Sequence, residues 1–366
     1  MAYNPNDNSF GVQLATKMQL ILDQPMSDMM TGLVNHDYEG EFFKIGDTVQ
    51  IVKPDVNSVN VSVGQAITPD GERQTFTLDS AGLSNNSVDD PANEAHGVND
   101  ARLQIRDLTF AKNELRIDKV SKYAFAVSDF TDAMGKWNYE SGGLDLAAYR
   151  LRKAHNAEIA TMAAGSTAVA TSQNADGLDA ILGTKSAPVS IANADQLYED
   201  VILPMFARLY DKGAITADGQ VPFGSNPTEG KQTYGKIYMD TKLYTLLLKS
   251  KYFTDRGGED AAEKIKTGKV KTITGLDVAI EPSLVAGNAS DASVKAGKKI
   301  YVDGLAAGTH VIIAGTKNAI TRAGKVLPPT SFKSHTRFAT EYHGCELYGQ
   351  KVFEPDALAV AYITLG

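Results

Sequence analysis

The chain has 366 residues, 43% of them hydrophobic and 22% charged, a composition typical of a folded protein with one elaborated domain or about two domains. The formal net charge of -8 and the pI near 5.3 argue against a basic face that grips nucleic acid, so any contact with DNA should be loose. The single cysteine excludes an internal disulfide and disfavours a zinc site, and we find neither a secretory signal nor an apolar run of about 18 residues that could span a membrane.

The N-terminal segment, to about residue 35, changes from polar to methionine-rich. Pro25 interrupts any single helix there. Because methionine packs adaptably, two interpretations stay open: an arm that lies on another surface, and a helix packed on the chain's own core. The apolar residues of this segment are Met18, Leu22, Met26, Met29, Met30 and Leu33.

Alternation of apolar and polar residues next predicts β-strands. One run places Val49 and Ile51 on one face, and a second covers 56–63. The stretch 68–102 is too polar to bury, which predicts a long β-arm with a solvated tip. Two such strands cannot form a compact core alone and need a partner surface. A third alternating run contains Leu115, Ile117, Tyr123, Phe125 and Val127.

A helix of about twenty residues, about 30 Å long, is predicted between Gly143 and Gly165. Gly142 and Gly143 precede its apolar stripe and Gly165 follows it, which is the glycine punctuation expected of helix ends. His155 lies within this helix beside two basic residues, and we interpret it as a solvated residue, with a catalytic role as the alternative. The stripe consists of Leu144, Ala148, Leu151, Ala154, Ile159 and Met162.

A mixed region of helices and strands follows, from about 175 to 325, and predicts an α+β or α/β layer. Its first helix, 195–213, is predicted to kink at Pro204 and to stop at Gly213. Its second helix begins after a short strand and is predicted to be capped by Thr241. The first helix carries Leu197, Val201, Met205 and Leu209 at a spacing of four, and the strands are predicted at 234–240, 276–284, 298–305 and 309–316.

Known sequence motifs for phosphate loops, dinucleotide turns, zincins, EF-hands and nucleophile elbows are absent. The six histidines are scattered through the chain. We therefore predict no catalytic residues, no cofactor-binding residues, no metal site and no cofactor. We interpret the acidic residues Asp255, Glu259 and Asp260 as part of a solvated loop, with a cation site as the alternative. We interpret Trp137 as an anchor for the helix entry, with a ligand-stacking role as the alternative.

Glu341, His343 and Cys345 are the most suggestive group, because alternate residues of a strand point the same way. They could form a nucleophile with its base. The continuing alternation into Leu347 and then Val352 favours a packed strand, and free cysteine is usually buried. We predict a structural cysteine, and a cysteine-dependent enzyme using Cys345 and His343 is the alternative.

The order of these parts resembles the major capsid proteins of tailed phages, whose shared fold is named after phage HK-ninety-seven. Residues 125–163 resemble the strand and spine helix of that family, and 341–363 resembles its closing segment. Residues 235–255 and 267–284 are similar to its recurrent strand, helix and glycine loop. The pattern in that loop rests on Gly268, Gly275, Leu276 and Val278.

The resemblance implies an α+β tailed-phage major-capsid fold. Its parts would be an N-arm at 1–40, an extended β-hairpin E-loop with flanking P-domain strands at 41–128, the P-domain spine helix at 129–175, a mixed α/β A-domain at 176–325, and closing strands at 326–366. The family is structural, so the resemblance also implies that the chain is not an enzyme.

The resemblance further implies self-assembly as pentamers and hexamers into an icosahedral head shell that encloses double-stranded phage DNA. The chain would be located in the virion and assembled in the cytoplasm of a bacterial host. Its partners would be copies of itself, scaffolding and portal proteins, and decoration proteins, with loose contact to packaged DNA and no membrane. The alternatives are an encapsulin-like shell protein and another virion component such as a tail tube.

Overall fold

The computed structural model describes residues 29–36, 44–54, 110–129, 139–216, 235–251 and 272–366. Its contacts define two units: Met1–Val49 with Leu115–Gly366, and Gln50–Glu114. The predictions for 56–63, for 68–102, for Trp137 and for the acidic loop with Asp255, Glu259 and Asp260 lie outside the described residues.

The smaller unit contains most of β2 (Thr48–Pro54) and β3 (Phe110–Arg116), which form a two-stranded sheet. Val49 and Ile51 are both buried, as expected for residues that share a face of the predicted strand. A two-stranded sheet has too little apolar surface to be stable alone. The strand pair therefore depends on other surface to cover it.

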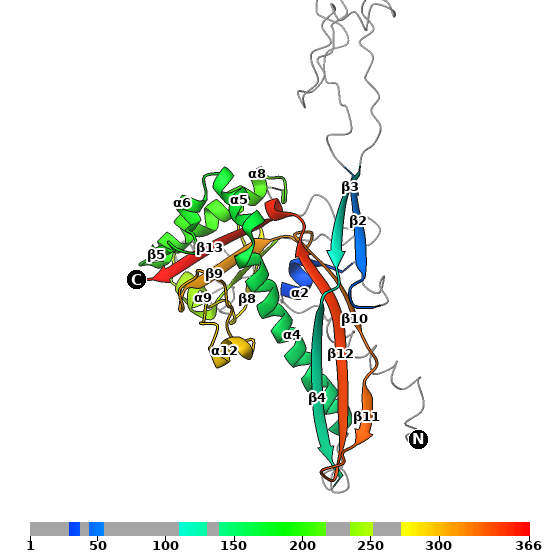
Figure 1. Ribbon diagram of the computed structural model, residues 1–366. Helices are drawn as coiled ribbons and strands as arrows, with labels where there is room; N and C mark the ends of the chain where they lie inside the picture. The colour runs from blue at the N-terminus through cyan, green and yellow to red at the C-terminus, as the bar shows by residue number, and fades with distance from the viewer. Residues whose placement is uncertain (1–28, 37–43, 55–109, 130–138, 217–234, 252–271) are drawn as a thin grey trace, which may run out of the picture. The chain divides into compact units, whose positions relative to one another are not determined.

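The first sheet of the larger unit is built around β12 (Ala339–Val352), a strand of 14 residues. On one side β12 pairs with β10 (Ile320–Val326) and β11 (Thr330–Lys333), and on the other side it pairs with β4 (Lys119–Ser128). A short parallel strand, β1 (Val34–Asn35), joins β10. Figure 1 shows β4, β12 and β11 side by side. β4 carries the predicted alternation, because Tyr123, Phe125 and Val127 alternate with exposed residues.

Helix α4 (Tyr139–Gly165) has 27 residues, so it is about 40 Å long and exceeds the predicted length. The glycines 142 and 143 lie inside it, and the prediction that they mark its start is wrong. A Cβ on Gly143 would fall 2.8 Å from Cδ2 of Phe125, so this glycine lets the helix approach β4 closely. Contacts of α4 reach β4 and β12 and also β9 and β13 of the second sheet, and α4 therefore joins the two sheets (Figure 1).

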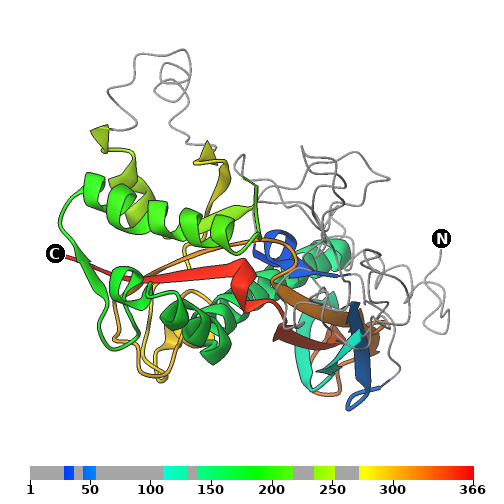
Figure 2. The same cartoon turned by 90° about the horizontal axis from the view of Figure 1, so that it is seen from above.

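The second sheet has the order β5 (Val189–Ile191), β13 (Leu358–Leu365), β9 (His310–Gly315), β6 (Lys236–Met239), β8 (Leu276–Ile280) and β7 (Thr272–Ile273). Strands β9 and β13 are buried on both faces, because their alternate residues enter two different apolar clusters. One cluster contains residues of α4 and the other contains residues of α8, so helices lie on both sides of β13 (Figure 2). This confirms the predicted layer of helices on a sheet.

The remaining helices are short. The predicted stripe of the helix at 195–213 is confirmed, because Leu197, Val201, Met205 and Leu209 are fully buried. Instead of one regular helix, a π-helical turn precedes Pro204, and Gly213 ends the helix with a φ of 67°. The segments are α2 (Met29–Gly32), α5 (Thr167–Ala175), α6 (Asp179–Leu182), α7 (Ala194–Gln196), η3 (Leu197–Ile202), α8 (Leu203–Asp211), α9 (Thr241–Leu247), α12 (Ala292–Lys295) and η4 (Pro355–Ala357).

Two local predictions change in the structure, and one open interpretation is decided. The cap of α9 is Asp240, whose side chain accepts a hydrogen bond from the Lys242 amide, and Thr241 is the first helical residue. The strand predicted at 298–305 does not form; Ile300 makes only an isolated bridge to Ala286. At the N-terminal segment, Met29, Met30 and Leu33 are buried in the core of their own chain, so the own-core interpretation holds for them.

Candidate functional site

The group suggested by the sequence lies on β12. Glu346 and Tyr348 contact side chains of α4, so the odd-numbered residues of β12 face away from that helix. Glu341, His343 and Cys345 therefore share the outer face, as predicted. His343 is exposed, lies 3.5 Å from a Glu341 oxygen, and stacks on the ring of Phe332 with centroids 4.8 Å apart.

Within the described residues, His343 makes no hydrogen bond to Cys345, so the thiol has no base beside it. The thiol is also not packed in the core, because Cys345 is only partly buried. The expected burial was wrong since the inward positions of this strand are Tyr342, Glu346 and Tyr348. The alternation of apolar residues that includes Cys345 marks the outer face of the sheet.

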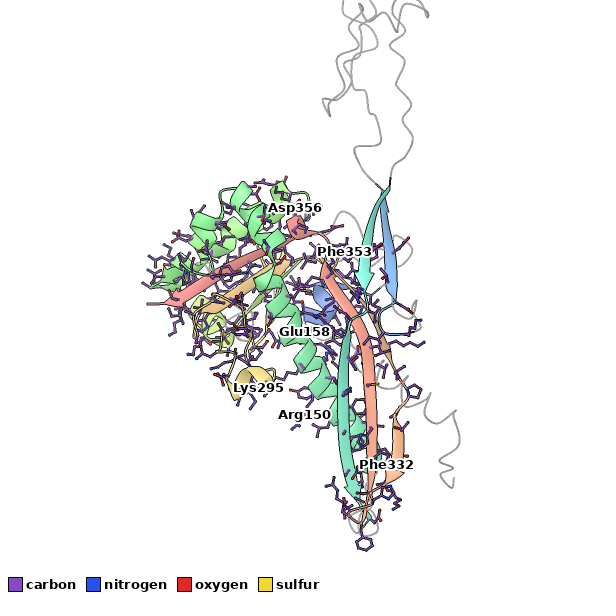
Figure 3. The ribbon with its side chains drawn as sticks, in the orientation of Figure 1. Arg150, Glu158, Lys295, Phe332, Phe353 and Asp356 are labelled. Atoms are coloured by element: carbon purple, nitrogen blue, oxygen red, sulfur yellow. The ribbon has the colours of Figure 1, made fainter. Side chains whose placement is uncertain are left out.

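This outer face carries exposed apolar side chains next to charged ones such as Lys122, which pairs across the strands with Cys345. Val120 on β4 is 37% exposed and Phe332 on β11 is 45% exposed. Ala124 and Ala126 are exposed beside them. Figure 3 shows Phe332 near one end of the sheet, whereas toward the other end a Cβ on Gly349 would lie 3.2 Å from the Ile117 backbone, which covers the face there. Exposed apolar patches of this kind usually mark contact surfaces.

A charged cluster that the sequence did not reveal lies on the opposite, inner face. Glu346 is 2% exposed, His155 of α4 is 1% exposed, and Arg322 of β10 is fully buried. His155 donates from Nε2 to Oε2 of Glu346 over 2.8 Å, and Arg322 donates to Oε1 of the same carboxylate. The prediction that His155 is solvated is therefore wrong, because its side chain points between α4 and the sheet.

The cluster continues to a second carboxylate, Glu158, one turn along α4. Its oxygens accept hydrogen bonds from Lys119 of β4 over 2.5 Å and from the Tyr348 hydroxyl over 2.6 Å. Burial opposes the ionisation of Glu158, but the nearby His155 ring, Lys119 and Tyr348 outweigh it and lower its pKa to about 2. Figure 3 shows Glu158 on the side of α4 that faces β4.

The same balance holds for Glu346. Burial would raise its pKa, yet the charge of Arg322 and the hydrogen bond from His155 keep the pKa below its usual value. The Arg322 guanidinium also lies 4.8 Å from the centre of the Tyr348 ring. Both carboxylates are thus ionised and held by cations or donors from α4, β4 and β10. Such a saturated arrangement leaves no oxygen available for acid–base catalysis on a substrate.

A second histidine–carboxylate pair lies in the other sheet, where β9 begins and β6 ends. His310 Nδ1 is 3.2 Å from Asp240 Oδ2, and both side chains are buried. Burial opposes the ionisation of Asp240, but His310 and backbone amides at the start of α9 lower its pKa. Because Asp240 also caps α9, we interpret the pair as structural.

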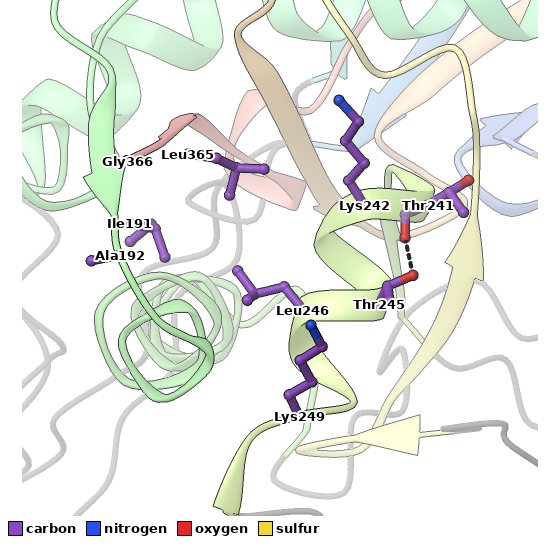
Figure 4. Close-up of a pocket in the computed structure, with 9 residues that line it drawn as sticks. All are labelled: Ile191, Ala192, Thr241, Lys242, Thr245, Leu246, Lys249, Leu365 and Gly366. Carbon is purple, nitrogen blue, oxygen red and sulfur yellow. Dashed lines mark hydrogen bonds between the residues drawn. The ribbon is translucent and has the colours of Figure 1, made fainter.

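One pocket of about 410 Å³ lies beside α9 (Figure 4). Its lining combines two lysines with hydroxyl and aliphatic groups, and the Thr245 hydroxyl is already bonded to the Thr241 carbonyl over 2.8 Å. The described lining holds no carboxylate side chain, histidine or cysteine, so it offers no catalytic group beyond the lysines. The lining residues are Ile191, Ala192, Thr241, Lys242, Thr245, Leu246, Lys249, Leu365 and Gly366.

A search of the described residues for three or more His, Cys, Asp or Glu side chains placed to hold a metal ion found no group. In the same part of the chain, no helix combines the length and the apolar character needed to cross a membrane.

No protein-family model matches the chain, and no curated protein matches its sequence. Solved structures do match. One from Mycobacterium phage Che8 is 14% identical, with a TM-score of 0.50, and the match covers 92% of this chain and 94% of that one. The mature capsid of bacteriophage PhiM1 is 12% identical at a TM-score of 0.48, covering 93% and 88%. A virus-like particle from Pyrococcus furiosus is 11% identical at 0.41, covering 96% and 99%.

The match at a TM-score of 0.50 shows a shared fold over nearly the whole chain. The chain has the α+β fold of tailed-phage major capsid proteins. This confirms the fold that the order of its sequence segments predicts. The boundaries given above for the N-arm, E-loop, P-domain and A-domain stay predictions.

Proposed function

We propose that this chain is the major capsid protein of a tailed bacteriophage. In this proposal it assembles as pentamers and hexamers into the icosahedral head shell that encloses double-stranded DNA. The observation that carries the proposal is the capsid fold, which extends over 92% of the chain in the match to the structure from phage Che8. Since a fold alone does not fix a function, the surfaces of the chain provide the supporting argument.

Two features of the chain complement each other in an assembly. A two-stranded sheet such as β2–β3 gains stability from further contacts, and the outer face of β4, β12 and β11 has exposed apolar side chains, among them Val120 and Phe332. A neighbouring copy can supply contacts to both. Contacts between unlike surfaces of identical copies are heterologous, and they generate closed rings when the rotation between copies closes. At about 25 cal/mol per Å² of apolar area, repeated contacts of this kind stabilise a shell.

The proposal also covers partners and location. Copies of the chain itself are the principal partner, together with scaffolding and portal proteins and with decoration proteins. The shell would be part of the virion and would assemble in the cytoplasm of the bacterial host. The net charge of -8 fits loose contact with packaged DNA, because phosphates bind strongly only to clustered cations.

The most direct test is the mass of the purified chain, measured by light scattering and negative-stain electron microscopy. We expect rings or shells of megadalton mass, formed by the chain alone or with its scaffolding protein. A chain that stays monomeric in every condition would contradict the proposal. Recovery of a defined cellular cargo protein inside the shells, with no phage DNA, would favour the encapsulin-like alternative.

The enzyme alternative has its own test. If Cys345 were a nucleophile with His343 as its base, Cys345→Ser would abolish a hydrolytic or transferase activity. The lack of a His343–Cys345 hydrogen bond in the described structure favours the structural role, and we propose that the chain is not an enzyme. We therefore expect Cys345→Ser to assemble as the unchanged chain does.

A further inference from the structure

The inner face of the first sheet holds α4 by two kinds of contact. The buried apolar residues of α4 are mostly small, and the alanines among them are Ala148, Ala157, Ala160, Ala163 and Ala164. Small side chains form shallow ridges, so these contacts alone would tolerate a slide of one helical step, about 1.5 Å along the axis. Around His155, away from the close contact of Gly143 with Phe125, apolar packing by itself therefore defines the position of α4 only loosely.

The second kind of contact does not tolerate such a slide. The 2.8 Å hydrogen bond from His155 to Glu346 would break after a shift of about 1.5 Å. The carboxylate would then lose one of its partners while still buried, which is strongly unfavourable. The other oxygen of Glu346 is held by Arg322 of the neighbouring strand, so the carboxylate cannot follow the helix.

Stability alone is a poor reason for this cluster. Buried ion pairs can often be replaced by apolar residues without loss of stability, and fixing a register is their best-attested use. Gly324 leaves room for the Glu346 carboxylate beside it. A Cβ at this position would lie 3.2 Å from Glu346 Oε1, which is closer than an ordinary van der Waals contact.

We propose that Glu346, Arg322 and His155 form a register latch, which fixes α4 at one position along β12. Because α4 also contacts β9 and β13, its position on β12 sets how the two sheets of the larger unit are placed against each other. If the chain forms a shell, as proposed above, the latch gives every copy the same geometry toward its neighbours and so narrows the range of shell sizes.

The test compares two substitutions of the helix-borne member of the latch in the full chain. His155→Leu removes the hydrogen bond to Glu346, keeps the bonds of Glu158 to Lys119 and Tyr348, and leaves Arg322 paired with Glu346, so the variant keeps no unpaired charge. His155→Gln keeps a donor that can reach the carboxylate. Hydrogen exchange of the α4 backbone amides is measured for the unassembled chain, and shell diameters are measured by electron microscopy.

We expect His155→Leu to exchange about 10- to 100-fold faster in α4, the effect of losing one hydrogen bond to a charged group. Its shells should have more than one diameter. His155→Gln should have nearly the same α4 exchange rates and the same shell diameter as the unchanged chain. A matched control, Arg208→Met, breaks the buried Arg208–Asp176 pair of α8 and should speed exchange there and not in α4.

Unchanged exchange in α4 of His155→Leu would overturn the latch. Faster exchange with shells of a single diameter would overturn its role in shell geometry. If the unchanged chain forms no shells, the proposed function fails while the exchange comparison still decides the latch. If His155→Leu does not fold, the apolar triple variant H155L/R322M/E346L replaces it, with the same expected exchange and diameters.

Discussion

Two adjacent glycines of α4 meet very different surroundings. Gly142 is exposed, and a Cβ built on it would have no heavy atom within 4 Å. A Cβ built on Gly143 would lie 2.8 Å from Cδ2 of Phe125 and closer still to Cε2. The Phe125 ring has little freedom to move, because it stacks on Tyr342 with centroids 5.0 Å apart. Alanine at these two positions should therefore have opposite effects on the free energy of unfolding.

The magnitudes follow from two competing terms. Replacing glycine by alanine inside a helix stabilises it by up to about 1 kcal/mol, and this gain applies at both positions. At Gly143 the added methyl also overpacks the contact with Phe125, which typically costs about 1–3 kcal/mol. We expect Gly142→Ala to stabilise the chain by up to about 1 kcal/mol. Gly143→Ala should be neutral to about 2 kcal/mol less stable than the unchanged chain.

Urea unfolding of the unassembled chain, followed by circular dichroism, measures the difference directly. The unchanged chain and both variants are compared at the same concentration, so that association affects all three equally. If Gly143→Ala were as stable as Gly142→Ala, the close packing of α4 on Phe125 would be refuted as the reason for the glycine.

Three further predictions test the carboxylates and the thiol. The pKa of Glu158, lowered to about 2 from 4.5, means that its contribution to stability is present above about pH 4.5 and is lost as the pH falls toward 2. Urea unfolding should therefore show a smaller decline between about pH 5 and about pH 3 for Glu158→Gln, and equal declines would contradict the assignment. Asp240→Ala should cost about 2 kcal/mol in thermal unfolding, because it removes the cap of α9 and the partner of a buried histidine. Asp291→Ala removes the cap of the exposed helix α12 and should cost less stability. Equal losses of stability in the two variants would argue against a contribution from the buried Asp240–His310 pair. A thiol reagent should label Cys345 readily in the free chain and slowly in assembled particles, whereas equal rates would show that no neighbour covers this face.

Periodicity predicts the apolar elements well. Leu197, Val201, Met205 and Leu209 recur at helical spacing and are all buried, because burial of one helix face is what produces that spacing. Strand β4 follows the same logic with a period of two. The order of the elements then leads to the fold, even though the sequence identity to the structure matched at a TM-score of 0.50 is only 14%.

The charged interior is beyond this kind of prediction. His155 follows two basic residues in sequence, and only the pairing of β12 with β10 brings Arg322 and Glu346 together beside it. Glu346 is a charged residue on the inner face of β12, where an apolar residue is expected. The sequence pattern therefore assigns the buried face to Cys345 and Leu347, which lie on the outer face. Long-range pairing of polar residues leaves no local period, and the sequence therefore could not place these three side chains together.

The position of β13 in its sheet also has a consequence for folding. Leu358–Leu365 pairs with β9 on one side and with β5 on the other, and the β5 partners Val189–Ile191 precede it by more than half of the described chain. β5 therefore cannot join the six-stranded sheet until β13, which lies between it and β9, has been synthesised. Such distant pairing predicts slow folding, and chains released before that strand should stay open and vulnerable to proteolysis.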